Sequence, residues 1–291
     1  MSRSEFSLNL TTPAGARTVT LSLDGAQMSQ RFMIEDFAQG RLYESETSNF
    51  IGSILAPGDT FIDVGAHVGY FSMLASVLVG EQGRVYSFEP ERANYEHLLE
   101  HIALNRATNV VPFHMAVGAS PSIADFFVNA DNDGGHGLWE VGRHPFNERT
   151  RQAPTTRKTF VTSLDQLFAG GDIGSLKAIK IDAEGSEFAA LIGARQLLTR
   201  YPVPFIIAEV NRFALESMGA SESHLRSLMG DTGYETYLFQ PGQTFLQRLC
   251  GNPGLLKSGG DGVAQLGKLR LLGNQDELIA KLKDRDWVAG L

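Results

Sequence analysis

Short apolar segments alternate with helix-like segments through the middle of the chain. A buried strand at 60–64 is followed by helical character at 70–79, and a second strand at 84–88 precedes a helix at 92–105. Such alternation implies right-handed crossovers and a parallel sheet. Further strands are expected at 110–114, 178–182, 205–210 and 234–239, and further helices near 187–199 and 222–229. The pattern therefore predicts an α/β fold with a mostly parallel sheet flanked by helices.

The segments outside this alternation indicate the domain organisation. Residues 1–50 alternate apolar and polar side chains, which predicts an N-terminal extension of short strands packed on a main domain at 51–291. Residues 129–159 are rich in turn formers, and we expect a lid-like insertion there. An antiparallel strand pair including 263–272 and a short charged helix at 277–283 are expected to close the chain.

The composition argues against several kinds of partner. The chain has 25 basic and 33 acidic residues, a net charge of −8, and no basic run, so nucleic-acid binding is not expected. No apolar run approaches membrane-spanning length, and no secretory signal is visible. The single cysteine, Cys250, favours a reducing compartment. We expect a cytoplasmic protein that acts on a small molecule, and the sequence gives no indication of its oligomeric state.

A turn containing two glycines follows the first strand. Residues 63–69 read Asp-Val-Gly-Ala-His-Val-Gly, at the strand end where open α/β sheets bind their ligands. Gly65 permits a tight turn and a close approach of the backbone to a ligand, and Gly69 permits close packing of strand and helix. His67 stands where a dinucleotide fingerprint has its second glycine. The turn therefore disfavours a nicotinamide dehydrogenase and favours a ligand without phosphates.

A carboxylate at the end of the next strand points to the same ligand. Glu89 follows the strand at 84–88 and lies 20 residues after Gly69 (89 − 69). At that position a carboxylate can accept hydrogen bonds from both hydroxyls of a ribose. A glycine turn combined with an acid on the neighbouring strand predicts an adenosine-containing ligand.

Three separated blocks resemble the FkbM-type methyltransferases, a branch of the class I S-adenosylmethionine-dependent family. The blocks are residues 63–71, 88–90 and 179–187, and the similarity covers roughly residues 55–240. The resemblance implies a Rossmann-like fold with a seven-stranded sheet, S-adenosyl-L-methionine as cofactor, and methyl transfer to oxygen on sugars or polyketide-like natural products. It assigns the amino-acid part of the cofactor to Asp63 and Gly65, and its ribose to Glu89. The residues expected at the cofactor are Tyr43, Asp63, Gly65, Ala66, His67, Gly69, Glu89, Pro90, Ala116 and Asp182.

Carboxylates after the strand at 178–182 are candidates for a general base. Asp182 and Glu184 are expected beside the transferred methyl group, and clustered carboxylates raise one another's pKa toward neutrality. His67 is a third catalytic candidate, although a histidine in such a turn is more often only a loop contact. The same carboxylates, joined by Glu209, could hold Mg²⁺ instead. The resemblance implies no metal, and none is included in the expected site.

Residues in the insertion and after the later strands are candidates for acceptor binding. His136 could approach the substrate when a lid closes, although a solvated loop histidine is the simpler interpretation. Trp139 could stack on a sugar or an aromatic ring, or it could anchor the loop by burial. Glu209 ends the strand at 205–210 and is expected near the acceptor. Tyr43 could close over the methionine end of the cofactor or be an ordinary packing residue.

These observations together predict an S-adenosylmethionine-dependent methyltransferase. The preferred reaction is O-methylation of a hydroxyl on a sugar or a secondary metabolite. One alternative is a divalent-metal-dependent O-methyltransferase of a vicinal diol. Another is a non-catalytic module that binds S-adenosylmethionine, although such a module would not need the carboxylates around Asp182.

Overall fold

The computed structural model describes residues 3–12, 15–238 and 269–272, and its centre is a seven-stranded sheet of order β11-β12-β10-β9-β3-β4-β5. Five of its strands are parallel, namely β10 (Phe205–Ala208), β9 (Ser175–Ile181), β3 (Asp59–Val64), β4 (Arg84–Phe88) and β5 (Val110–Phe113). At one edge β12 (Leu269–Leu272) pairs antiparallel with both β10 and β11 (Glu235–Leu238). The expected α/β fold with a mostly parallel sheet is confirmed.

The parallel strands separate two hydrophobic cores, one on each face of the sheet. Phe61 and Ala178 face the first core, whereas their neighbours Ile62 and Ile179 face the second, as the two-residue period of a strand requires. The first core is covered by α2 (Ser45–Ile54), α3 (Tyr70–Val79) and α4 (Arg92–Asn105). The second is covered by α6 (Leu164–Leu167), α7 (Glu187–Ile192), α8 (Arg195–Arg200), α9 (Arg212–Ser217) and α10 (Glu222–Asp231). Burial on both faces explains why the strands appear as continuous apolar runs.

The N-terminal extension is an antiparallel hairpin followed by a helix. Strands β1 (Ser4–Thr12) and β2 (Gly15–Leu23) confirm the expected strands, but α1 (Met28–Ala38) and α2 were not expected. The buried His101 of α4 connects this hairpin to the glycine turn. Its Nε2 accepts from the Ser22 N–H at 2.9 Å, and its Nδ1 donates to the Val68 carbonyl oxygen at 2.6 Å. Burial lowers the pKa of His101, which keeps the imidazole neutral for this bridge.

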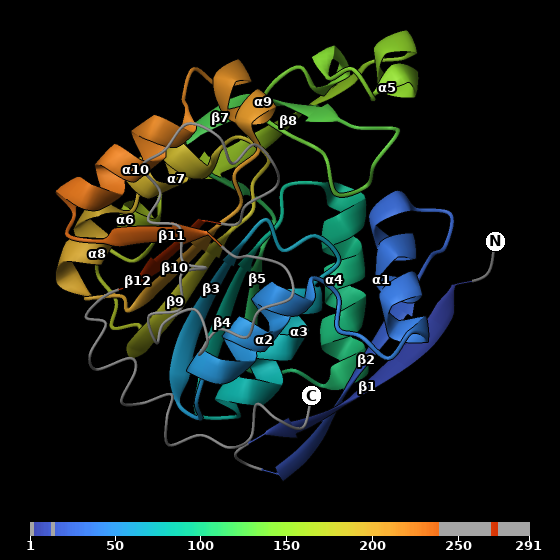
Figure 1. Cartoon of the computed structure of the whole chain (residues 1–291), viewed down its shortest axis with the longest axis vertical. Helices are drawn as coiled ribbons and strands as arrows, with labels where there is room; N and C mark the ends of the chain where they lie inside the picture. The colour runs from blue at the N-terminus through green and yellow to red at the C-terminus, as the bar shows by residue number, and fades with distance from the viewer. Residues whose placement is uncertain (1–2, 13–14, 239–268, 273–291) are drawn as a thin grey trace.

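The segment expected to form a lid connects two strands of a second sheet and contains short helices. Strands β6 (Ala116–Val117), β8 (Thr155–Thr162) and β7 (Ser122–Val128) form this three-stranded sheet. Between β7 and β8 the chain carries the short helices η1 (Val141–Arg143) and α5 (Glu148–Gln152). Figure 1 shows β7, β8 and α5 gathered at one end of the molecule. The expected insertion at 129–159 therefore includes the first residues of β8.

Several expected elements have the boundaries that the sequence indicated. The helices at 70–79 and 92–105 and the strand at 84–88 are confirmed. The prediction of one continuous helix at 187–199 is wrong, because the structure has two helices there, α7 and α8, which are separated at Gly193. A Cβ atom on Gly193 would lie 2.1 Å from the Gly118 carbonyl oxygen. The helix expected at 277–283 and the beginning of the pair at 263–272 lie outside the described residues. In the part of the chain that the structure describes, no helix combines the length and the apolar character needed to cross a bilayer.

Candidate active site

A cavity of about 440 Å³ lies where four parallel strands end. Residues that follow β3, β4, β9 and β10 line it, which is the ligand-binding edge of an open α/β sheet. The N-terminal extension and the insertion complete its wall. Of the residues expected at the site, those that line the cavity are Tyr43, Gly65, Ala66, His67, Glu89, Pro90, Ala116, His136, Asp182, Glu184 and Glu209. Asp63, Gly69 and Trp139 are not among the lining residues.

The glycine turn is fixed by contact with the neighbouring strand exit. Gly65 has φ +78°, and a Cβ atom on it would lie 1.7 Å from the carbonyl oxygen of Asp182. The backbone N–H groups of Gly65 and Ala66 both donate to the Phe88 carbonyl oxygen at 2.9 Å. The sequence suggested that glycine is needed for the approach of a ligand. The structure shows a more immediate reason, which is that the Asp182 backbone occupies the space of a side chain.

Glu89 presents a buried carboxylate at one end of the cavity. The residue is 5% exposed, and its two oxygens accept from the backbone N–H groups of His67 at 2.8 Å and Glu91 at 2.7 Å. Burial raises the pKa of Glu89 to about 7, although these two hydrogen bonds act in the opposite direction. The carboxylate is therefore held in one orientation and titrates near neutral pH.

A buried lysine that the sequence analysis did not single out connects two of the expected acids. Lys180 is 3% exposed, and its Nζ lies 3.0 Å from Asp182 Oδ2 and 3.9 Å from Asp63 Oδ1. The ammonium also lies 4.8 Å from the centre of the Phe71 ring. Burial disfavours the charged lysine, but Asp182 and Asp63 raise the pKa of Lys180 above its ordinary value. Asp63 thus faces a buried ion pair and accepts from Ser72 Oγ at 2.7 Å.

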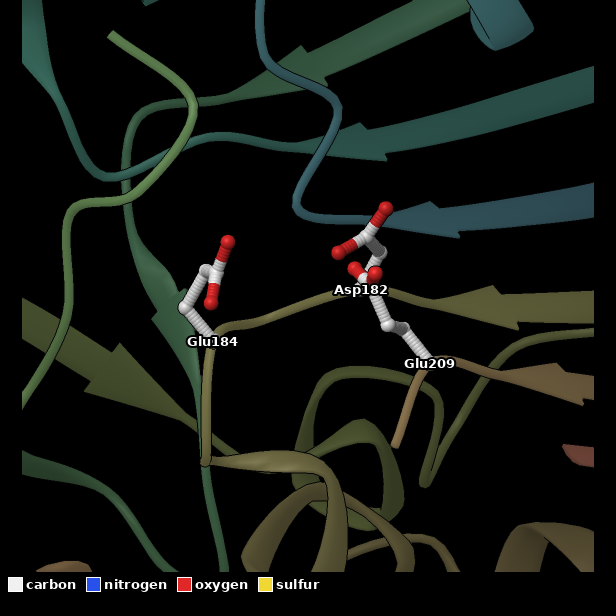
Figure 2. Close-up of side chains that lie close together, drawn as sticks. All are labelled: Asp182, Glu184 and Glu209. Atoms are coloured by element: carbon white, nitrogen blue, oxygen red, sulfur yellow. The ribbon is translucent and has the colours of Figure 1, made fainter. Parts of the chain in front are cut away.

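Three carboxyl groups converge at the end of the cavity formed by β9 and β10. One oxygen each of Asp182, Glu184 and Glu209 lies within 4.8 Å of the others, and Figure 2 shows Asp182 and Glu209 side by side. The charge of Asp182, together with burial, raises the pKa of Glu209 well above its ordinary value. Burial opposes ionisation of Asp182, but Lys180 and a hydrogen bond with Glu209 lower its pKa. The negative charge is therefore favoured on Asp182 and the proton on Glu209.

Glu184 differs from this pair in the hydrogen bonds that hold it and in its pKa. Asn211 Nδ2 donates to Glu184 Oε2 at 2.9 Å, and Trp139 Nε1 donates to the Glu184 carbonyl oxygen at 2.8 Å. The backbone of Glu184 is left-handed, with φ +46°, which costs a non-glycine residue about 1 kcal/mol or more. Burial, followed by the charges of Asp182 and Glu187, raises the pKa of Glu184 to about 8. The sequence prediction did not include Asn211 as a site residue, because nothing marks it except its position two residues after Glu209.

The insertion contributes one lining histidine and one anchoring tryptophan. His136 Nδ1 accepts from the Asn129 N–H at 2.8 Å, so its neutral ring carries the proton on Nε2. Burial lowers the pKa of His136 to about 4, and the ring is neutral at pH 7. Trp139 is 7% exposed and packs 5.6 Å from the Phe213 ring. Trp139 thus holds the backbone of Glu184 in place, which matches the anchoring role that the sequence left open.

The sequence matches the profile of the Methyltransferase FkbM domain over residues 63–236, which is more than half of the chain. The chain belongs to the FkbM methyltransferase family. This confirms the resemblance noted from the three sequence blocks, and S-adenosylmethionine is the cofactor of the chain. None of the curated proteins matches the sequence.

Solved structures similar to this FkbM family member include several methyltransferases. Methyltransferase FkbM from Methylobacillus flagellatus is 16% identical, with a TM-score of 0.43 over 79% of this chain and 52% of that one, so this chain spans about half its length. An S-adenosylmethionine-dependent O-methyltransferase from Thermotoga maritima is 11% identical, with a TM-score of 0.43 over 91% and 77%. Fibrillarin from Aeropyrum pernix, with natively bound S-adenosylmethionine, is 13% identical, with a TM-score of 0.37 over 78% and 73%.

Proposed function

We propose that this FkbM family member transfers the methyl group of S-adenosylmethionine to a hydroxyl oxygen of a neutral, polyhydroxylated small molecule, such as a sugar or a secondary metabolite. The proposal depends mainly on the position and the raised pKa of Glu184. Glu184 lines the cavity, is oriented by Asn211, and has a pKa of about 8 because of burial and neighbouring charges. A carboxylate that titrates near neutral pH at the ligand-binding edge of the sheet suits the removal of a proton from a hydroxyl.

The cavity fits S-adenosylmethionine in size and in charge. A volume of about 440 Å³ lies within the usual range of small-molecule sites. Glu89 supplies a fixed carboxylate at one end, and we assign it to the two ribose hydroxyls. Asp182, which follows β9 and lines the cavity, complements a ligand that carries positive charge on its sulfonium and amino groups. The same arrangement offers a pyrophosphate only one lysine or arginine among the described lining residues, Lys180, which is already paired with Asp182. This agrees with the glycine turn, which disfavours NAD.

Glu184 is the residue that we assign as general base. When bound, S-adenosylmethionine supplies a methyl group that is already activated by the sulfonium. The protein therefore has to position the acceptor oxygen and accept its proton. The hydrogen bond from Asn211 occupies Glu184 Oε2 and leaves Oε1 available for the acceptor hydroxyl. Asp182 is less suited as the base, because Lys180 and Glu209 already use its oxygens.

The charges around the cavity limit the acceptor to neutral molecules. The acidic residues that line it are Glu44, Glu89, Asp182, Glu184 and Glu209, whereas Lys180 is the one lysine or arginine among the described lining residues. The ammonium of Lys180 is already paired with Asp182. A phosphate or carboxylate on the acceptor would therefore find no unpaired lysine or arginine among the described lining residues. Hydroxyl groups, in contrast, can donate to these carboxylates.

A second candidate function is favoured by the spacing of the three acids. Oxygens around one Ca²⁺ or Mg²⁺ lie at most about 4–5 Å apart, because metal–oxygen distances are about 2.0–2.6 Å. The oxygens of Asp182, Glu184 and Glu209 fall within 4.8 Å of one another. This spacing would suit a divalent-metal-dependent transfer to a vicinal diol. The ion pair of Asp182 with Lys180 favours the metal-free reaction, since a divalent cation would have to lie beside an ammonium group.

An acceptor panel tests both candidates. The protein would be incubated with methyl-labelled S-adenosylmethionine and matched acceptors: neutral hexosides, the corresponding sugar phosphates and the corresponding uronic acids. We expect label in neutral acceptors, little in the anionic ones, and unchanged rates after addition of EDTA. Preferential labelling of the anionic acceptors would contradict the proposed acceptor class. Activity that EDTA abolishes and Mg²⁺ restores would favour the second candidate.

The titration of Glu89 predicts the pH dependence of cofactor binding. The ionised carboxylate accepts hydrogen bonds from the ribose, and its pKa of about 7 means that the carboxylate takes up a proton as the pH falls below 7. Affinity for S-adenosylhomocysteine should therefore decrease below pH 7, approaching about tenfold per pH unit. In Glu89→Gln the affinity should be lower at pH 8 and nearly constant between pH 6 and 8. A wild-type affinity that does not change over this range would contradict the assignment of Glu89.

A further inference from the structure

Asp133, in the insertion, holds together three segments around the cavity. Its carboxylate accepts from His67 Nε2 at 2.9 Å, from the Ser29 N–H at 2.7 Å and from Gln30 Nε2 at 3.0 Å. Asp133 is 8% exposed, and its carbonyl oxygen accepts from Asn94 Nδ2 at 2.8 Å. One residue thus connects the insertion with α1, α4 and the glycine turn. No sequence pattern marks Asp133 as a site residue.

These contacts determine which nitrogen of His67 carries the proton. Burial opposes ionisation of Asp133, but the hydrogen bonds from His67, Gln30 and Ser29 lower its pKa to about 2. An ionised carboxylate can only accept, so His67 Nε2 donates. In the neutral ring Nδ1 then has a free lone pair. No hydrogen bond within the described part of the chain reaches His67 Nδ1.

His67 lies beside the carboxylate that we assign to the cofactor. His67 lines the cavity, and its backbone N–H donates to Glu89 Oε2 at 2.8 Å. The residue is therefore beside the carboxylate assigned to the ribose. Its backbone is left-handed, with φ +52°, a conformation that persists only where surrounding contacts hold it. The bond to Asp133 is one of those contacts, and the bond to Glu89 is another.

We propose that Asp133 is a positioning residue that fixes His67 as a hydrogen-bond acceptor for a donor group of S-adenosylmethionine. The insertion then contributes to cofactor affinity through the glycine turn. The donor is an N–H or O–H group, supplied either by a ribose hydroxyl or by the ammonium of the amino-acid part. This proposal rests on the binding of S-adenosylmethionine in the cavity. Of the two roles expected for His67, it favours the cofactor ligand over the candidate base.

Calorimetric titration with S-adenosylhomocysteine tests the proposal without knowledge of the acceptor. Asp133→Asn keeps the size of the side chain, but its amide can donate to His67 Nε2 and so favour the other tautomer. We expect the Kd of this variant to rise about tenfold, the effect of one good hydrogen bond. The matched control is Asp131→Asn. Asp131 lies in the same loop but bonds Thr150 and the Arg149 N–H instead of His67. Its Kd should change by less than about twofold.

A shorter ligand identifies the donor. Methylthioadenosine retains the ribose but lacks the amino-acid part of the cofactor. A ribose hydroxyl as donor predicts that Asp133→Asn weakens both ligands by the same factor. The ammonium as donor predicts that only S-adenosylhomocysteine is weakened. An equal Kd in the wild type and in Asp133→Asn for both ligands would overturn the proposal.

Nitrogen-15 spectra of the wild-type histidines provide a measurement that needs no folded variant of Asp133. His67→Asn identifies the signals of His67. We expect Nε2 protonated and Nδ1 unprotonated in the free protein, with a shift of Nδ1 when S-adenosylhomocysteine binds. A protonated Nδ1, or an Nδ1 signal that does not respond to the ligand, would contradict the proposal. Failure of the wild type to bind S-adenosylhomocysteine would instead contradict the proposed function, and with it this inference.

Discussion

Replacing Glu184 by glutamine should lower kcat by about 10²–10⁴-fold, the usual contribution of a general base. Glutamine keeps the shape of the side chain and can still accept from Asn211, so the loop should retain its structure. The affinity for S-adenosylmethionine should change little, because the residues that we assign to the cofactor are Glu89 and His67 and not Glu184. The measurement is the rate of labelled methyl transfer to the best neutral acceptor, together with calorimetry of the cofactor.

The pH profile distinguishes a base from a residue that only shapes the cavity. With a pKa of about 8, Glu184 is increasingly ionised as the pH rises from 6 to 9, and kcat of the wild type should increase over that range. Glu184→Gln should lose this dependence. Glu140→Gln in the insertion is a control, since Glu140 is exposed and paired with Arg143. A Glu184→Gln variant that retains more than half of the wild-type kcat would exclude Glu184 as the base.

Replacing Gly65 by alanine should destabilise the fold by about 2–4 kcal/mol. Overpacking costs about 1–3 kcal/mol, and the left-handed backbone adds about 1 kcal/mol for a residue with a Cβ atom. The new Cβ atom would lie 1.7 Å from the backbone carbonyl oxygen of Asp182. Because this oxygen belongs to the backbone, rotation of a side chain cannot relieve the clash. Movement of Asp182 would also displace Glu184 and Lys180, and activity should be lost together with stability.

Gly58→Ala is the matched control for this substitution. Gly58 also has a positive φ of +90°, but no atom lies within 4 Å of the position of its Cβ. The substitution should therefore cost only the backbone strain of about 1 kcal/mol. Urea unfolding of both variants measures the difference. Equal losses of stability would mean that the contact with Asp182 relaxes freely and does not fix the turn.

The sheet and the cofactor turn could be predicted because their signals are local. The strand at 84–88 and the helix at 92–105 are contiguous patterns, and the glycine turn connects a strand to the next helix within seven residues. The helix α1 has no such pattern. Its buried residues include Ser29 and Gln30, which bond Asp133 instead of forming an apolar stripe. Tertiary hydrogen bonds therefore replace the periodicity by which a helix is recognised.

The supporting residues of the site could not be predicted for a similar reason. Asp133 contacts His67 across 66 positions, and Asn211 contacts Glu184 across 27. Neither pair has a spacing that a sequence pattern encodes. Lys180 lies inside a buried strand, where a lysine is unexpected unless its partners are known. The carboxylates themselves were predictable because they follow strands, whereas the groups that orient them depend on the fold.

Calorimetric titration of the wild-type protein and of Glu89→Ala with S-adenosylmethionine tests whether the cavity binds the cofactor through Glu89. We expect binding in the wild type and an affinity about 10–100-fold lower in the variant, because hydrogen bonds to a charged group contribute about 1.5–3 kcal/mol. Equal affinity in the two proteins would contradict the assignment of Glu89 to the ribose of the cofactor. A folded wild-type protein that does not bind S-adenosylmethionine at millimolar concentration would contradict the assignment of the cavity as a methyltransferase site.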